Sequence, residues 1–160
     1  MMGGILGHGW TQGNHSVRFS RLENPDSESS MSGMLKRIHH AAIIASDYEV
    51  SKRFYTGCLG LRVVAETYRA ERQSHKLDLA LPDGSQIELF TFPAAPLRLD
   101  SPEALGLRHL AFAVEDVAEC KAALEGMGIP VEPIRVDELT GREFTFFKDP
   151  DGLPLELYQD

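Results

Sequence analysis

The sequence predicts an α+β fold built from two tandem βαβββ modules, and three observations support this prediction. The order of one strand, one helix and three strands occurs twice along the 160 residues. The turn Pro-Asp-Gly at 82–84 recurs 68 positions later at 150–152. The composition, 42% hydrophobic and 25% charged, is typical of one globular domain or of two small modules that share a core.

The first module is expected over residues 34–93. A continuous apolar run predicts a strand at its start, and Ser46 followed by Glu49 forms a capping box that predicts a helix, which Gly60 would end. The four strands predicted in this module cover residues 37–45, 61–68, 76–82 and 85–92. The last two are joined by the Pro-Asp-Gly turn.

The second module is expected over residues 107–160, after a proline-containing linker at 94–106 that has no sustained hydrophobic period. A helix is predicted at 115–128. The strands predicted in this module cover residues 107–114, 129–136, 142–149 and 153–159. Residues 34–160 are thus expected to form a single domain of two structural copies.

Residues 1–33 are rich in Gly, Ser and Asn and follow neither hydrophobic period. They are expected to be a flexible N-terminal tail. The sequence leaves open whether this segment belongs to the native protein, since Met34 would be a natural start for the folded part.

Charge and composition exclude several classes of partner. The net charge is −8, from 16 Lys and Arg against 24 Asp and Glu, and no basic patch argues for nucleic acid. The apolar runs are far shorter than the ~20 residues of a membrane-spanning helix. Cys58 and Cys120 are expected to be reduced thiols, and no export signal is recognised, so a cytoplasmic location is expected. The expected partner is a small molecule.

Each module contributes one histidine and one glutamate at matching positions, His40 with Glu88 and His109 with Glu156. Each glutamate stands between apolar residues of a predicted strand, where an ionised carboxylate is costly without a partner. Imidazole and carboxylate groups are suitable ligands for a divalent metal such as zinc, nickel, cobalt, manganese or iron(II). The alternatives are glutamates that face solvent and histidines that only form structural hydrogen bonds.

At these residues the sequence resembles the vicinal oxygen chelate superfamily, which contains glyoxalase I, methylmalonyl-CoA epimerase, extradiol dioxygenases, and fosfomycin- and bleomycin-resistance proteins. The resemblance covers residues 35–159 and points to short bacterial glyoxalase-I-like (lactoylglutathione lyase-like) proteins. The segments that carry it are "IHHAAIIASDYEVSKRFYTGCLGLRVV", "GSQIELF", "GLRHLAFAVEDV" and "FKDPDGLPLELY". It implies that the modules form a curved, incomplete barrel around one metal ion. The implied metal ligands are His40, Glu88, His109 and Glu156.

The resemblance also implies a lyase or isomerase chemistry. One divalent metal ion per site, with nickel, cobalt or zinc expected, would stabilise the enediolate formed from a small α-oxygenated carbonyl adduct of the hemithioacetal type. Glu156, or Glu88 by pseudo-symmetry, would act as the base, and the resemblance favours Glu156. The substrate is expected to be a small molecule such as a thiol or CoA adduct. A homodimer is expected, and the sequence leaves open whether the modules pair within one chain or between two.

Two other functions remain possible from the sequence. One is an epimerase of acyl-CoA thioesters like methylmalonyl-CoA epimerase, and the other is a metal-independent small-molecule-binding or resistance protein of the same fold. The complete set of four ligands counts against the second. Four arginines lie where they could reach an anionic substrate, and each is expected to be a solvent-exposed charge: Arg69, Arg72, Arg98 and Arg142.

Overall fold

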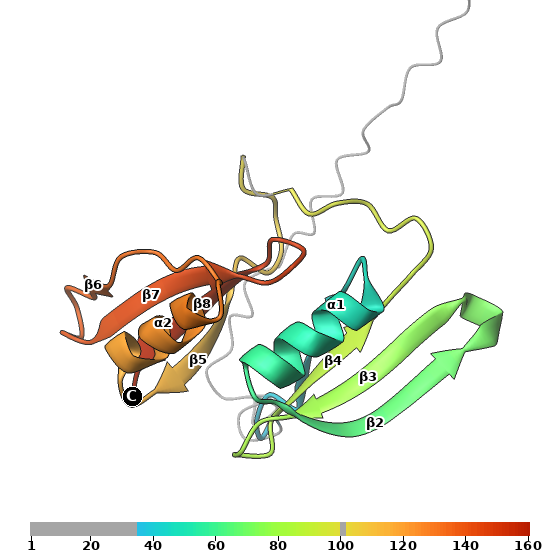
Figure 1. Ribbon diagram of the computed structural model, residues 1–160, viewed down its shortest axis with the longest axis horizontal. Helices are drawn as coiled ribbons and strands as arrows, with labels where there is room; N and C mark the ends of the chain where they lie inside the picture. The colour runs from blue at the N-terminus through green and yellow to red at the C-terminus, as the bar shows by residue number, and fades with distance from the viewer. Residues whose placement is uncertain (1–34, 100–101) are drawn as a thin grey trace, which may run out of the picture. The chain divides into compact units, whose positions relative to one another are not determined.

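The structure, a computed structural model, describes residues 35–99 and 102–160 (Figure 1). Residues 37–160 form one compact unit. The expected tail at 1–33 lies outside the described residues, as do two residues of the linker.

The first module has the predicted order of one strand, one helix and three strands. Its sheet has the strand order β1-β4-β3-β2, in which β1 runs parallel to β4 and the other neighbours are antiparallel. A single π-helical turn, η1, extends the helix, and a short 3-10 turn, η2, lies between β2 and β3. The elements are β1 (His40–Ile44), α1 (Tyr48–Arg53), η1 (Phe54–Cys58), β2 (Arg62–Arg69), η2 (Ala70–Arg72), β3 (Ser74–Ala80) and β4 (Gln86–Phe90).

The second module repeats this topology, with the strand order β5-β8-β7-β6. Its elements are β5 (Leu110–Val114), α2 (Val117–Gly126), β6 (Arg135–Val136), β7 (Glu143–Lys148) and β8 (Pro154–Gln159). The predicted α+β class and the βαβββ order of both modules are confirmed. The two sheets remain separate four-stranded sheets, so the described strands form no closed barrel.

One predicted strand is much shorter than expected. The sequence predicts a strand at 129–136, but only Arg135 and Val136 pair with β7, and Val131 forms an isolated bridge with Phe147. Pro130 and Pro133 interrupt this segment, and a proline cannot donate a backbone hydrogen bond to a neighbouring strand. The second sheet therefore has a short outer strand.

The residue that caps the first helix differs from the sequence prediction. The N-cap of α1 is Asp47 and not Ser46: Oδ1 of Asp47 accepts a hydrogen bond of 2.9 Å from the backbone N–H of Val50. Asp116 caps α2 in the same way, accepting from the N–H of Glu119 at 2.8 Å. The repeat thus preserves the cap as well as the order of elements.

One hydrophobic core fills the helix side of both sheets. It contains residues of the helices and of the central strands from both modules, and Tyr55, Leu77, Leu79 and Leu155 are completely buried in it. The rings of Phe54 and Phe147, one from each module, lie 6.4 Å apart. The helices lie on one face of each sheet (Figure 1), which leaves the other face of each sheet outside this core. No helix in the described part of the chain is long and apolar enough to cross a membrane.

The two Pro-Asp-Gly turns have different contacts despite their identical sequence. In the first turn, Oδ1 of Asp83 accepts hydrogen bonds from the backbone N–H and the hydroxyl of nearby Ser85. In the second turn, Oδ2 of Asp151 accepts a bond of 3.0 Å from the backbone N–H of Ser46, next to α1. The second turn therefore helps to join the modules.

Candidate functional site

The first histidine and glutamate meet on the open face of the first sheet. The register of β1 with β4 places Ala42 opposite Glu88, so Glu88 shares a face with His40, two residues before Ala42. Nε2 of His40 lies 3.7 Å from Oε2 of Glu88. The Glu88 side chain is only 15% exposed, whereas that of His40 is 40% exposed. Glu88 therefore does not face solvent, which was one of the alternatives left open by the sequence.

The second histidine and glutamate form a tighter pair on the open face of the second sheet. The register of β5 with β8 places Ala111 opposite Glu156, which brings His109 to the same face. Nε2 of His109 lies 3.0 Å from Oε2 of Glu156, whose side chain is 11% exposed. The ring of Phe146 meets the His109 ring edge-on, with 5.2 Å between the ring centres.

The structure brings the four predicted ligands together as two pairs and not as one cluster. Among residues 35–99 and 102–160, no group of three or more His, Cys, Asp and Glu side chains is placed to hold a metal ion. Each pair nevertheless offers an imidazole nitrogen beside a largely buried carboxylate, which is a suitable donor combination for a divalent metal. Each pair fits half of a four-ligand site.

A lysine holds Glu88 from its other side. Nζ of Lys76 donates to Oε1 of Glu88 at 3.0 Å and also to Oδ1 of Asp78. Asp78 and Glu88 lie directly opposite each other on β3 and β4, so their like charges need a cation between them. The hydrogen bond to Asp78, ahead of that to Glu88, raises the pKa of Lys76. Lys76 is thus committed to these two carboxylates.

Aromatic residues occupy the corresponding face of the second module. Phe146 on β7 pairs with Glu156, and Phe144 pairs with Tyr158, at the positions that Asp78 and Lys76 occupy in the first module. The Arg135 guanidinium lies 4.9 Å and 5.3 Å from the centres of the Phe144 and Phe146 rings. The first sheet therefore presents a charged face and the second an aromatic one.

The Tyr158 hydroxyl makes polar contacts at the end of this aromatic face. It donates to Oδ2 of Asp137 at 3.0 Å and lies 2.6 Å from the hydroxyl of Thr140. A backbone hydrogen bond from Leu139 and the bond from Tyr158 lower the pKa of the Asp137 carboxyl. Tyr158 is therefore fixed in place at the end of the row of rings.

Arg69 differs from the expectation that it would be a solvent-exposed charge. It is half-buried at the end of β2, where it pairs with Ser74 of β3. Its guanidinium lies 4.9 Å from the centre of the Phe90 ring on the charged face. The other three arginines are exposed as predicted: Arg72, Arg98 and Arg142. No sequence pattern distinguishes Arg69 from them, because its burial depends on the pairing of three strands.

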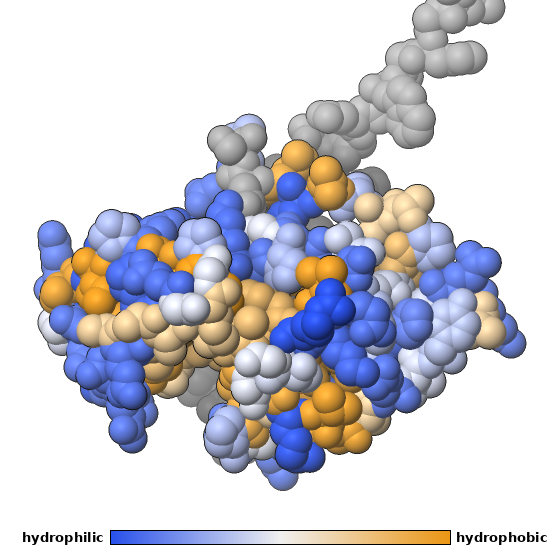
Figure 2. Space-filling view, viewed as in Figure 1, coloured by the Kyte–Doolittle hydropathy of each residue, from blue (hydrophilic) through white to orange (hydrophobic). Residues whose placement is uncertain are grey.

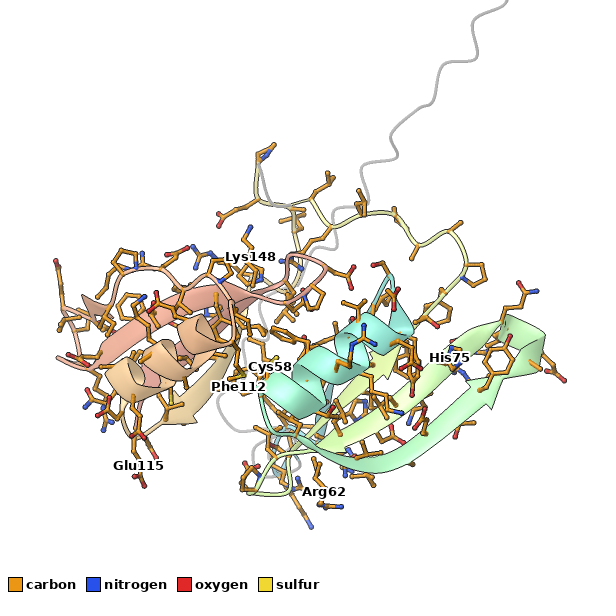
Figure 3. All side chains as sticks on the ribbon, viewed as in Figure 1. Cys58, Arg62, His75, Phe112, Glu115 and Lys148 are labelled. Carbon is orange, nitrogen blue, oxygen red and sulfur yellow. The ribbon has the colours of Figure 1, made fainter. Side chains whose placement is uncertain are left out.

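The helix sides of the sheets carry other groups. His75, labelled in Figure 3, lies on the helix face of β3, where its ring stacks on Tyr48 of α1 at 4.3 Å. Cys58 and Cys120 are free thiols that line one apolar pocket with Phe112 (Figure 3). Burial raises the pKa of the Cys120 thiol. These groups belong to the core side and are separate from the two His–Glu pairs.

Comparisons with known proteins agree with the fold described above. The model of the family described as Glyoxalase/Bleomycin resistance protein/Dioxygenase superfamily matches residues 37–157. The chain is 59% identical over 126 residues to the Bacillus subtilis (strain 168) protein YwkD, covering 79% of this chain and 98% of that protein.

Two solved structures are also similar. A glyoxalase family protein from Enterococcus faecalis is 52% identical, with a TM-score of 0.73, and the match covers 78% of this chain and 98% of that one. The trypanothione-dependent glyoxalase I of Leishmania major is 26% identical, with a TM-score of 0.61, over 78% of this chain and 87% of that one.

Proposed function

This chain belongs to the Glyoxalase/Bleomycin resistance protein/Dioxygenase superfamily, and we propose that within it the chain is a divalent-metal-dependent lyase or isomerase of the glyoxalase I type. The observation that carries the proposal is the His–Glu pair at equivalent positions on the open face of each sheet, His40 with Glu88 and His109 with Glu156. Its substrate class is a small α-oxygenated carbonyl adduct, such as the hemithioacetal of a 2-oxoaldehyde and a thiol.

The proposed metal site takes one pair from each of two chains. Within one chain the pairs stand apart, and each forms only half of a ligand set. β1 begins with His40 and β5 directly follows His109, and both are edge strands that have no second neighbouring strand among the described residues. Large apolar residues near them are exposed, including Ile44 at 56% and Leu107 at 54%. Figure 2 shows the side on which the helices lie, where apolar patches alternate with hydrophilic ones. These observations support a homodimer with two shared sites.

A divalent metal held by two imidazoles and two carboxylates would polarise two adjacent oxygens of the substrate and so favour loss of a proton from the carbon between sulfur and carbonyl. The chain's own residues would then move that proton. A carboxylate at this place can accept the proton from one carbon and return it to the neighbouring carbon, which completes the isomerisation.

We assign the base role to Glu156. Glu88 has a partner at each carboxylate oxygen. Oε1 accepts a hydrogen bond from Lys76, and Oε2 faces Nε2 of His40. Glu156 has the His109 contact at Oε2, and in the described part of the chain no lysine or arginine forms an ion pair with it. Its neighbours on the adjacent strands are Phe146 of β7 and Ala111 of β5. A carboxylate with fewer fixed partners is better suited to move towards a substrate carbon.

Metal analysis of the purified protein tests the site directly. Glu88→Gln and His109→Ala should each lose bound divalent metal, whereas Glu66→Gln, which changes an exposed glutamate of β2, should keep it. Unchanged metal content in both ligand variants would refute the ligand assignment.

Activity tests the substrate class separately. The metal-loaded protein should convert the hemithioacetals of methylglyoxal with small thiols, and Glu156→Gln should lose this activity while the protein remains folded. A metal-loaded protein that is inert towards every such adduct would reject the substrate class and leave the metal site standing.

A further inference from the structure

We infer that Arg69 forms a binding subsite for a carboxylate group of the substrate, on the charged face of the first sheet beside the His40–Glu88 pair. The inference deepens the proposed function, and it rests on that function only for the reacting end of the substrate. It adds that the substrate carries a negative charge at the other end, on an apolar stem.

The first argument is an uncompensated charge. Among the residues that the structure describes, no carboxylate forms an ion pair with Arg69, although the side chain is half-buried. Its Nε is completely buried and has no hydrogen-bond partner within the described part of the chain. A guanidinium taken out of water without a counter-ion is costly, and an unpaired buried donor adds to that cost. An anionic ligand would offset both.

The second argument is that the guanidinium is already fixed in place. One terminal nitrogen, Nη2, donates to the hydroxyl of Ser74 at 2.7 Å, and Ser74 itself is fully buried. The guanidinium lies against Phe90 and Phe92, at 4.9 Å and 5.8 Å from their ring centres. The two rings are stacked, 6.1 Å apart. A preorganised group loses little conformational freedom when a ligand binds.

The third argument is position. Phe90 lies two residues after Glu88 on β4, which is about 6.6 Å along an extended strand. The Lys76 ammonium connects the two places, because it donates to Glu88 and lies 5.8 Å from the centre of the Phe90 ring. A substrate whose reacting end is at the His40–Glu88 pair therefore reaches Arg69 with a short chain.

The chemistry of these groups favours a carboxylate. The planar guanidinium presents parallel N–H donors that match the two oxygens of a carboxylate. Lys76 is already occupied by Asp78 and Glu88, so the subsite offers one positive charge, which matches a singly charged anion. The rings of Phe90 and Phe92 supply an apolar wall for the stem that carries it.

Equilibrium binding tests the subsite without any reaction. The probes are (methylthio)acetate, CH3–S–CH2–COO⁻, and its neutral amide, 2-(methylthio)acetamide. Each is titrated into the full-length protein, and binding is followed by NMR. The wild type should bind the carboxylate about 10-fold or more tightly than the amide, and Arg69→Gln should abolish this preference. Arg69→Lys keeps the charge but loses the planar fork, so it should keep only part of the preference.

The matched control is Arg62→Gln. Arg62 (labelled in Figure 3) is exposed and stands at the opposite end of β2 from Arg69, so this variant should keep the full preference. Equal binding of the acid and the amide by the wild type would overturn the inference, as would a preference that survives in Arg69→Gln. Competition by inorganic phosphate more strongly than by the carboxylate would assign the subsite to phosphate and so overturn the carboxylate class.

Kinetics separate this inference from the proposed function. Hemithioacetals of methylglyoxal with mercaptoacetate and with mercaptoacetamide differ only in the terminal charge. The ratio of their kcat/KM values should favour the acid in the wild type and approach one in Arg69→Gln. Inactivity towards both adducts, with the binding preference intact, would reject the proposed reaction and leave the subsite standing.

Discussion

The hydroxyl of Tyr55 donates a hydrogen bond of 3.0 Å to Oδ2 of Asp149, and this buried contact joins the first module to the second. The Tyr55 side chain is completely buried, and burial raises the pKa of its hydroxyl, so the hydroxyl remains a donor. The other oxygen of Asp149 accepts from the backbone N–H groups of Asp151 and Leu153. The carboxylate thus ties the second turn to the first module.

Tyr55→Phe should lower the free energy of unfolding by about 1–3 kcal/mol, because it leaves a buried carboxylate oxygen without its donor. Urea unfolding followed by circular dichroism measures this change. Tyr68→Phe is the control, since Tyr68 is 56% exposed, and its effect should stay within about 0.5 kcal/mol. Equal effects of the two substitutions would contradict the role given to the Tyr55–Asp149 bond.

The Asp149 carboxyl gives the fold a pH dependence of known sign. Burial raises the pKa of Asp149 above its ordinary value, and hydrogen bonds from Leu153 and Tyr55 oppose this shift without cancelling it. The folded state therefore binds the proton more tightly than the unfolded state does. The resulting contribution to stability is fully present below the unfolded pKa and is lost as the pH rises through the folded pKa.

Asp149→Asn removes this titration and keeps an acceptor for the backbone N–H groups. Between about pH 3 and about pH 7, the free energy of unfolding of the wild type should therefore fall relative to that of the variant. Urea unfolding at several pH values measures the difference. A constant difference, or one that grows in favour of the wild type as the pH rises, would be inconsistent with the raised pKa.

Lys76→Met should destabilise the protein more than Lys52→Met does. The first substitution leaves Asp78 and Glu88 facing each other across two strands without a cation. The second breaks the ion pair with the more exposed Glu66 and the contact of the Lys52 ammonium with the Tyr48 ring, and such exposed contacts contribute little to stability. Thermal unfolding compares the two variants.

Added divalent metal provides a second readout for Lys76→Met. Since metal binding at Glu88 would supply the missing positive charge, saturating metal should narrow the gap between the two lysine variants. A gap that is unaffected by metal would argue against Glu88 as a ligand.

Mixing two inactive variants tests whether the site is shared between chains. One variant carries His40→Ala and Glu88→Gln, and the other carries His109→Ala and Glu156→Gln. In a symmetric dimer with shared sites, each mixed dimer regains one complete site, so random pairing should restore about one quarter of the wild-type metal content and activity. If the pairs met within one chain, neither variant would hold a complete site and the mixture would stay inactive.

Much of the fold follows from the sequence because duplication makes the pattern testable. The recurrence of Pro-Asp-Gly and of the His and Glu positions predicts two βαβββ modules, and the structure has them in that order. The sequence predicts Ser46 as the cap, but Asp47 has the extended backbone that a cap requires, with φ of −125°. Which of two adjacent polar residues caps a helix depends on the backbone path, which the sequence pattern does not specify.

The histidine and glutamate of each pair could be predicted, whereas their surroundings could not. His40 and Glu88 occupy the positions in the first module that His109 and Glu156 occupy in the second, so the repeat predicts both pairs. The roles of Lys76 and Arg69 depend instead on which strand lies beside which, and β4 lies between β1 and β3 in the sheet although it follows both in the chain. The alternation of residues along a strand does not show which other strands lie next to it in the sheet.

The difference between a charged first sheet and an aromatic second sheet has a consequence for stereochemistry. A cleft enclosed by two identical modules would present the same groups to both ends of a bound molecule, and either orientation would fit equally well. A cleft that takes one sheet of each kind has distinguishable ends, with Lys76 and Arg69 at one and Phe144 and Phe146 at the other. Such a cleft discriminates between the two directions in which a substrate enters, and therefore between the two faces of the carbon that exchanges its proton.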